Sequence, residues 1–153
     1  MSKKNSGFTL IELLVVIGIL GILLAIVLIA INPARQFAQA NNTARRSDVN
    51  SLLNSIHQFA ADNKGVLPTN MPAKGDPAEN ISSTAANICG DISPTYIAQL
   101  PTDPTKNIPA VGDCAVAYDT GYQVAVDAKG RVTVSAPGAQ AVGDTTPVIS
   151  VTR

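Results

Sequence analysis

Apolar side chains are concentrated in one long run near the N-terminus of the chain. Residues 8–31 contain a single charged residue, Glu12. As a helix, these 24 residues span about 36 Å, which exceeds the roughly 30 Å of a bilayer's hydrocarbon core. A secretory signal peptide has a shorter apolar core and a small-residue cleavage site, which the sequence from Ile31 to Ala34 matches poorly. The run therefore predicts a membrane helix that is retained.

The helical pattern continues beyond this run but becomes one-sided. The segment from Ala34 to about Asn63 contains no Gly or Pro, and its apolar stripe has helical spacing: Val49, Leu52, Leu53, Ile56 and Phe59. The pair Lys64-Gly65 is a typical helix stop. We expect the one-sided half to pack on a globular head. The all-apolar half has no partner inside the chain, so it must be buried in lipid or against other copies.

Three residues mark where this long helix is expected to bend or loosen. Pro33 lacks an N–H donor and crowds the preceding turn, and Gly18 and Gly21 each lower helix propensity by about 1 kcal/mol. Glycine is also frequent in membrane helices, where it allows close packing. Taken alone, Gly18 or Gly21 is therefore explained as well by packing as by a loosened helix. We expect any melting of the helix to fall between Gly18 and Pro33.

The region after the helix predicts loops with little regular structure. Pro and Gly residues interrupt residues 66–87, where only a short helix around Ala78–Ala86 fits the pattern. The segment Asp91–Pro101 predicts one helical turn that Pro101 closes.

The last third of the chain predicts a three-stranded antiparallel meander. Its strands are Cys114–Tyr118, Tyr122–Val126 and Arg131–Ser135, joined by turns at Asp119–Gly121 and Asp127–Gly130. A small sheet needs a cover for its apolar face, which the helical stripe provides. The fold class is therefore α+β: a long N-terminal helix whose C-terminal half packs on a small antiparallel three-stranded sheet.

Charge excludes one class of function. The chain has 11 basic and 11 acidic residues, a formal net charge of zero, whereas nucleic-acid-binding domains are normally basic. Hydrophobic residues make up 46% of the chain although aromatic residues make up only 4%. The apolar excess is explained by the N-terminal run alone.

The residues around the start of the run form a specific motif. A polar leader with two lysines, Lys3-Lys4, is followed by Gly7-Phe8-Thr9-Leu10-Ile11-Glu12. From Lys3 to about Ile31 the chain resembles the signal of the type IV pilin and type II secretion pseudopilin superfamily. The resemblance implies that a prepilin peptidase cleaves between Gly7 and Phe8 on the cytoplasmic face and that the new Phe8 amine is methylated. It also implies a type IV pilin-like fold, and an assembly ATPase and a membrane platform protein as partners.

Glu12 and Thr9 of this motif are the candidate assembly residues. A carboxylate in a membrane helix costs at least about 2.5 kcal/mol and usually marks a function. Cleavage after Gly7 gives Phe8 an ammonium group, and both charges then need partners in apolar surroundings. In a helical array the Glu12 carboxylate of one subunit meets the Phe8 ammonium of its neighbour, which sets axial register more than raw stability. The alternative is an acidic residue that lies near the membrane interface by chance.

The two cysteines predict a disulfide. Cys89 and Cys114 both lie in the part expected outside the cytoplasm, where disulfides persist. A bridge closing 26 residues stabilises by roughly 3–4 kcal/mol in the loop-entropy description. Metal binding is the alternative, but two thiols and one distant histidine do not make a closed zinc site.

Enzyme and cofactor chemistry find little support. His57 is the sole histidine and lies beside the helical stripe, and the familiar nucleotide-binding and hydrolase motifs do not occur. The major pseudopilins that the chain resembles carry calcium in this region, but the aspartates here lack a recognisable loop spacing. We interpret them as solvated turn residues: Asp103, Asp113, Asp119 and Asp127. We therefore expect no cofactor, no metal site and no catalytic residue.

Taken together, the pattern predicts a structural subunit. We divide the chain into a cleaved leader (1–7), a transmembrane and filament-core helix (8–31), its amphipathic continuation (32–64), a head (65–136) and an extended or mobile tail (137–153). The subunit crosses the inner membrane once with a cytoplasmic N-terminus, contacts lipid, and then forms a homo-oligomeric filament at the cell surface or in the periplasm. The segment Leu100–Pro104 resembles one found in many pseudopilins and in some bacterial pilins. The segment Tyr96–Pro104 and the small head make a secretion or DNA-uptake pseudopilus the alternative. A monomeric membrane-anchored binding domain is a third class, which leaves the Gly7–Glu12 motif unexplained.

Overall fold

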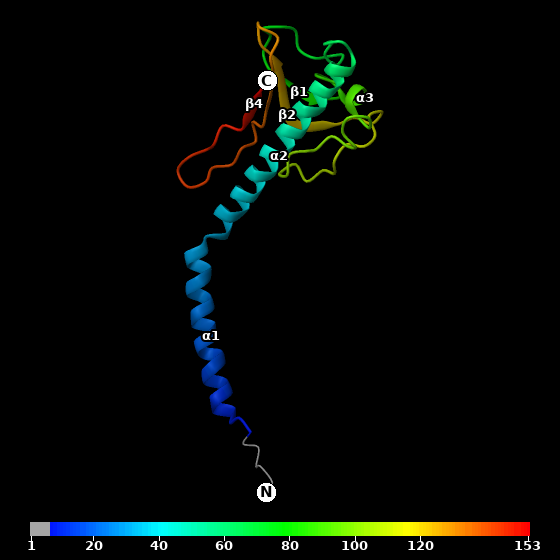
Figure 1. Cartoon of the computed structure of the whole chain (residues 1–153). Helices are drawn as coiled ribbons and strands as arrows, with labels where there is room; N and C mark the ends of the chain where they lie inside the picture. The colour runs from blue at the N-terminus through cyan, green and yellow to red at the C-terminus, as the bar shows by residue number, and fades with distance from the viewer. Residues whose placement is uncertain (1–6) are drawn as a thin grey trace. The chain divides into compact units, whose positions relative to one another are not determined.

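Two helices separated by one residue form the N-terminal part of the chain. A computed structural model describes residues 7–153, with α1 at Leu10–Ile31 and α2 at Pro33–Asp62 (Figure 1). The chain divides into two compact units, one ending at Phe37 and the other covering Ala38–Arg153. Each unit is described by itself below.

The break between the helices follows from the Asn-Pro sequence. Proline disfavours the α conformation of the preceding residue, and asparagine tolerates the left-handed region. Asn32 accordingly has φ 46° and ψ 83°, which ends α1. Its Oδ1 accepts a hydrogen bond from the Arg35 N–H at 3.3 Å, while Pro33 opens α2, where a missing N–H is harmless. The interruption therefore lies at Asn32, directly before Pro33, and α1 is continuous through Gly18 and Gly21.

The end of α2 has the predicted stop. Gly65 has φ 88°, and its N–H donates to the Ala60 carbonyl at 2.7 Å. This left-handed position is one that glycine adopts without strain.

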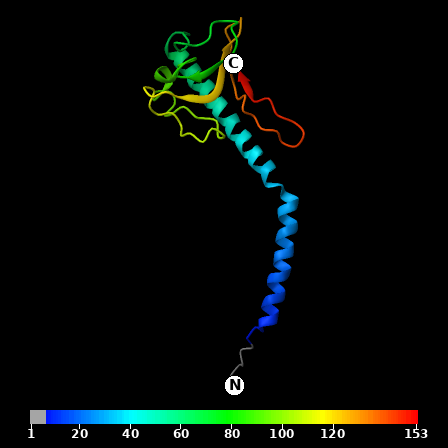
Figure 2. The ribbon, with the colours of Figure 1, turned by 180° about the vertical axis from the view of Figure 1, so that it is seen from behind.

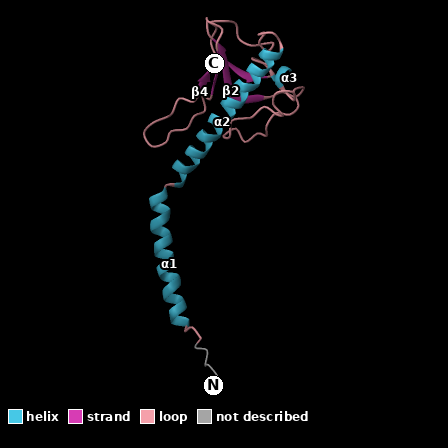
Figure 3. Cartoon of the chain, in the orientation of Figure 1, coloured by secondary structure: helices cyan, strands magenta, loops and turns pink. Residues whose placement is uncertain are grey.

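The second unit contains a four-stranded antiparallel sheet in the order β1-β2-β3-β4. Its strands are β1 Glu79–Ser82, β2 Asp119–Val126, β3 Val132–Ser135 and β4 Ser150–Thr152. Figure 3 draws the strands of the chain in magenta. The hairpin between β2 and β3 is the predicted one, because Gly130 has φ 85° and donates to the Asp127 carbonyl. The α+β class is confirmed, with four strands instead of three.

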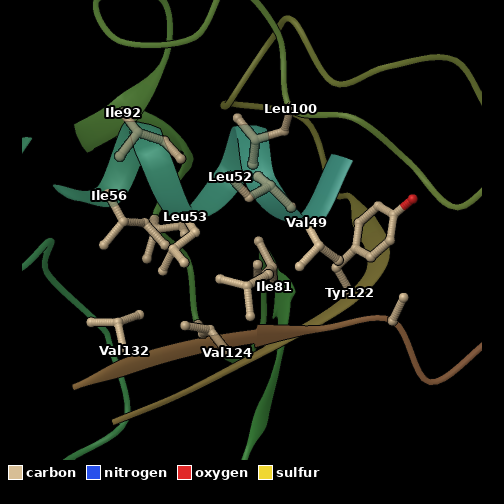
Figure 4. Packing of buried hydrophobic residues seen from close by; sticks show 14 of the residues in the cluster. Val49, Leu52, Leu53, Ile56, Ile81, Ile92, Leu100, Tyr122, Val124 and Val132 are labelled. Carbon is tan, nitrogen blue, oxygen red and sulfur yellow. The ribbon is translucent and has the colours of Figure 1, made fainter. Parts of the chain in front are cut away.

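The apolar stripe of α2 and one face of the sheet form the core. Residues of β2 are alternately half-buried and buried, so one face of the strand points inward. Figure 4 shows the α2 side chains pointing toward those of β1, β2 and β3. Fully buried core residues include Val49, Leu52, Leu53, Ile56, Ile81, Val124 and Val132. Phe59 is partly buried and packs on this cluster, which confirms the stripe.

Two predicted elements before β2 are wrong. Residues 78–86 hold strand β1 and not a helix, because Glu79 and Asn80 pair with Val124 and Gln123. Residues 114–118 are not a strand. Asp113 accepts the Ala115 N–H at 2.9 Å and turns the chain there.

The predicted turn at Asp119–Gly121 is instead the beginning of β2. Its pairing with β1 is irregular between Asn80 and Ser82. Gly121, at φ 80°, supplies the left-handed residue that such an irregularity often contains. The strand therefore bends where a turn was expected.

The helical turn and the tail also differ from expectation. The short helix α3 is at Cys89–Ile92, earlier than the centre of the predicted segment Asp91–Pro101. The tail is not free, because β4 pairs with β3 through Val151 opposite Val134. The loop of residues 136–149, which connects β3 to β4, runs beside α2 (Figure 2). There Asn42 Nδ2 donates to the Gln140 carbonyl at 2.7 Å.

Candidate processing and assembly site

Thr9 and Glu12 form a reciprocal hydrogen-bonded pair at the start of α1. The Thr9 hydroxyl accepts the Glu12 N–H at 3.3 Å. Glu12 Oε2 accepts the Thr9 N–H at 2.8 Å and the Thr9 hydroxyl at 2.7 Å. This capping box satisfies two groups that the first helical turn leaves open. The same contacts give the Glu12 carboxylate, which lies in an apolar segment, two hydrogen-bond donors from its own chain.

The Gly7–Phe8 bond lies just ahead of the helix. Gly7 and Phe8 precede α1, and the Phe8 side chain is 88% exposed. An added Cβ at Gly7 meets no atom within 4 Å. The backbone at this bond is therefore non-helical and accessible, as cleavage requires. The leader residues before Gly7, including Lys3-Lys4, lie outside the described residues.

The surface of α1 is apolar on every side. Every residue from Leu10 to Ala30 is exposed, and all of them except Glu12 and the glycines are apolar. The length and composition of this helix suffice to cross a membrane. Gly18 and Gly21 have no neighbouring atoms within 4 Å of an added Cβ. Glu12 is therefore the one charged residue of α1, whose apolar side chains pack against no other element of the described chain.

Cys89 and Cys114 form the predicted disulfide, with their Cα atoms 5.5 Å apart. Cys89 is buried at the start of α3. The bridge therefore ties α3 to the irregular segment before β2, and not to a strand as expected.

A buried ion pair between Arg45 and Asp103 was not predicted. Arg45 Nε and Nη2 donate to Asp103 Oδ2 and Oδ1, each at 2.8 Å. The two side chains are 0% and 3% exposed. Burial disfavours the charged form of Asp103, but hydrogen bonds from Arg45 and Thr105 outweigh it and lower the pKa of Asp103 to about 2. Asp103 is thus a buried structural anion, and its interpretation as a solvated turn residue is wrong.

The sequence did contain a signal for Arg45. It lies four residues before Val49, so the buried stripe of α2 continues into polar positions. The turn before that holds Asn42, which is also buried. Charged residues are rarely fully buried unless they are paired, and the partner Asp103 is remote in the sequence.

Asp48 and Tyr122 extend the polar contacts of α2. The Tyr122 hydroxyl donates to Asp48 Oδ2 at 2.6 Å. Burial raises the pKa of Asp48, although the hydrogen bond from Tyr122 acts in the opposite direction. Burial also raises the pKa of Tyr122, and the Asp48 carboxylate adds to this shift. Asp48 is therefore held in place by a neutral donor.

The remaining turn aspartates have local partners. Asp119 pairs with Lys106, whose hydrogen bond lowers the pKa of Asp119. Asp127 pairs with Arg131 at 2.7 Å, and hydrogen bonds from Arg131 lower its pKa. Within residues 7–153, acidic, histidine and cysteine side chains form no group of three that suits a metal ion. His57 is half-buried, and its Nε2 has no hydrogen-bond partner in the described part of the chain.

Comparison with known families gives a match at the N-terminus. Residues 2–28 match the family described as the prokaryotic N-terminal methylation motif. The matched stretch contains Thr9, Glu12 and the Gly7–Phe8 bond. Neither the curated proteins nor the solved structures give a match to the chain.

Proposed function

We propose that this chain, which carries the N-terminal signal of type IV pilin and pseudopilin precursors, is the precursor of a structural filament subunit. A prepilin peptidase removes residues 1–7, and Phe8 becomes the methylated N-terminus. Residues 8–31 hold the subunit in the inner membrane with its N-terminus in the cytoplasm. The subunit then polymerises into a type IV pilus-like filament through this helix, served by an assembly ATPase and a membrane platform protein.

The observation that carries the proposal is the unpartnered apolar surface of α1. Its large apolar side chains from Leu10 to Ile29 are 49–83% exposed. At about 25 cal/mol per Å² of apolar surface, leaving a helix of this kind in water is prohibitive. Lipid covers this surface before assembly, and the helices of other copies cover it in the filament. The head needs no such cover because its own core is closed.

Glu12 supplies the charge that places one subunit against the next. The capping box lies after the Gly7–Phe8 bond, so cleavage leaves it intact. Thr9 uses its N–H and hydroxyl on Oε2 alone. Oε1 can therefore accept the Phe8 ammonium of a neighbouring subunit while Thr9 keeps the carboxylate in position.

The alternative role is the major subunit of a type II secretion or DNA-uptake pseudopilus. The segment Tyr96–Pro104 and the small head favour it, because Leu100–Pro104 resembles a segment of many pseudopilins, although some bacterial pilins share it. Leu100 is buried in the core, and Asp103 is the anion of the buried ion pair. Both residues stabilise the head, so their presence in the segment is explained by the fold in either kind of filament.

Mass spectrometry and assembly assays test the proposal. The membrane form from cells with the peptidase should lack residues 1–7 and carry a methyl group on Phe8. An intact N-terminus in such cells would overturn the processing step. Glu12→Ala should abolish filaments while the subunit stays stable in the membrane. The matched control is Glu79→Ala, which removes the one other glutamate of the chain, in the exposed part of β1, and should leave filaments unchanged.

A further inference from the structure

Two exposed side chains follow closely after the apolar helix. Phe37 is 71% exposed, and within α2 no other large apolar side chain is exposed. Arg35 is also exposed, and its guanidinium takes part in no hydrogen bond or ion pair within residues 7–153. Both residues belong to the same compact unit as α1.

Their place along the chain sets them close to a membrane surface. The membrane-length helix extends to Ala30, five residues before Arg35 and seven before Phe37. At about 1.5 Å per residue, the Cα atoms of the two residues lie about 8 and 11 Å beyond the apolar span. The headgroup layer adds about 5–7 Å on each side of the hydrocarbon core, and helix tilt brings residues closer to it.

The chemistry of both side chains suits this depth. Aromatic rings favour the boundary between acyl chains and headgroups. Arginine extends its apolar stem along that boundary and binds phosphate oxygens through two parallel N–H groups. No acidic residue occurs between Glu12 and Asp48, so nothing nearby in the sequence repels an anionic headgroup.

We propose that Arg35 and Phe37 form an interfacial anchor that binds an anionic phospholipid of the extracytoplasmic leaflet in the unassembled subunit. Arg35 contacts the lipid phosphate, and the Phe37 ring lies at headgroup depth. The anchor rests on the membrane insertion proposed above for α1. It fixes how deep α1 lies before the subunit leaves the bilayer.

A single tryptophan reports the depth of residue 37. The chain has no native tryptophan, so Phe37→Trp gives one signal in the full-length precursor. The protein is reconstituted in vesicles of phosphatidylcholine and phosphatidylglycerol that contain lipids brominated at shallow or deep acyl positions. We expect a blue-shifted emission that shallow bromines quench more than deep ones. The matched control is Val66→Trp, at a 63% exposed site of the head, which should stay unquenched. Equal, water-like emission from both variants would overturn the anchor.

The lipid preference of Arg35 is tested in the same Phe37→Trp background. About 1 kcal/mol per arginine at an anionic surface corresponds to a roughly fivefold preference for brominated phosphatidylglycerol over brominated phosphatidylcholine. Arg35→Gln should remove this preference. Arg46→Gln, eleven residues further along α2, should keep it. Equal loss in both variants, or no preference in the parent, would refute the role of Arg35.

These vesicle experiments do not depend on polymerisation. If Phe37→Trp is shielded only in assembled filaments, a second copy of the chain and not lipid covers this position, and the anchor is wrong while the filament proposal stands. If the precursor shows the anchor but forms no filaments in its own cells, the filament proposal fails and the anchor stands.

Discussion

Replacing Arg45 by methionine removes the cation from a fully buried ion pair. Each of the five guanidinium N–H groups has an acceptor: both oxygens of Asp103, the Thr105 hydroxyl, and the side-chain oxygens of Asn42 and Gln140. These acceptors come from α2, from the loop before β2 and from the loop that leads to β4. One side chain therefore joins three segments that are remote in the sequence.

The expected loss follows from what remains after the change. Removing one partner of a buried pair leaves an uncompensated charge and typically costs about 3–5 kcal/mol. The pKa of Asp103, lowered from 3.8 to about 2, corresponds independently to about 2 kcal/mol of preference for the ionised form. Since small domains are stable by about 5–15 kcal/mol, Arg45→Met should remove a large share of the stability of the head.

The pH dependence of stability tests the direction of the pKa shift of Asp103. The folded pKa of Asp103 is below its unfolded value, so its contribution is present above about pH 4 and is lost as the pH falls toward 2. In Arg45→Met the buried carboxylate has no cation, and we expect its folded pKa to lie above the unfolded value. The difference in stability between the two proteins should therefore shrink as the medium becomes acidic.

Urea unfolding of the full chain in detergent measures these effects. Tyrosine fluorescence follows the head, because Tyr122 is buried in its core and the chain has no tryptophan. Arg46→Met, at an exposed neighbouring position, should change stability by less than about 0.5 kcal/mol. The double variant Arg45→Met, Asp103→Leu should recover part of the loss. A cost below about 1 kcal/mol for Arg45→Met, or strictly additive effects in the double variant, would refute the reasoning.

Three further perturbations test other parts of the head. Replacing Cys89 and Cys114 by serine should lower the free energy of unfolding by about 3–4 kcal/mol in urea titrations. A reduced wild-type protein that is as stable as the oxidised one would contradict this. Gly138→Ala should destabilise by about 1–3 kcal/mol in thermal unfolding, because the new Cβ lies 2.6 Å from Asp103 Oδ2, whereas Gly90→Ala, with open space around it, is the near-neutral control. Deleting residues 150–153 should speed amide hydrogen exchange in β3, which loses its partner strand, and unchanged exchange rates would show that β4 adds nothing.

Features that depend on neighbours in the sequence were predicted well. The apolar run, the stripe of α2 and its glycine stop follow from periodicity and capping, and the hairpin at Asp127–Gly130 follows from turn chemistry. The disulfide was predicted because two cysteines in one compartment leave few alternatives. The interruption at Asn32, directly before Pro33, follows because proline disfavours the helical conformation of the residue that precedes it.

Features that depend on remote pairing were not predictable in this way. β1 is only four residues long, and its helix-compatible sequence becomes a strand because the edge of β2 is available beside it. β4 consists of three residues in a stretch without strong alternation. In both cases tertiary pairing decides the conformation against a weak local preference.

The carboxylates of Asp103 and Glu12 differ in the partners that they have within the chain. Asp103 has its cation inside the head, and the hydrogen bonds of that cation are complete. Glu12 has only the two Thr9 donors, both on Oε2, and Oε1 accepts no hydrogen bond from residues 7–153. A carboxylate in an apolar environment requires charge compensation as well as hydrogen bonds. Asp103 therefore stabilises a single chain, whereas in the proposed filament the Glu12 carboxylate receives its cation, the Phe8 ammonium, from a neighbouring subunit.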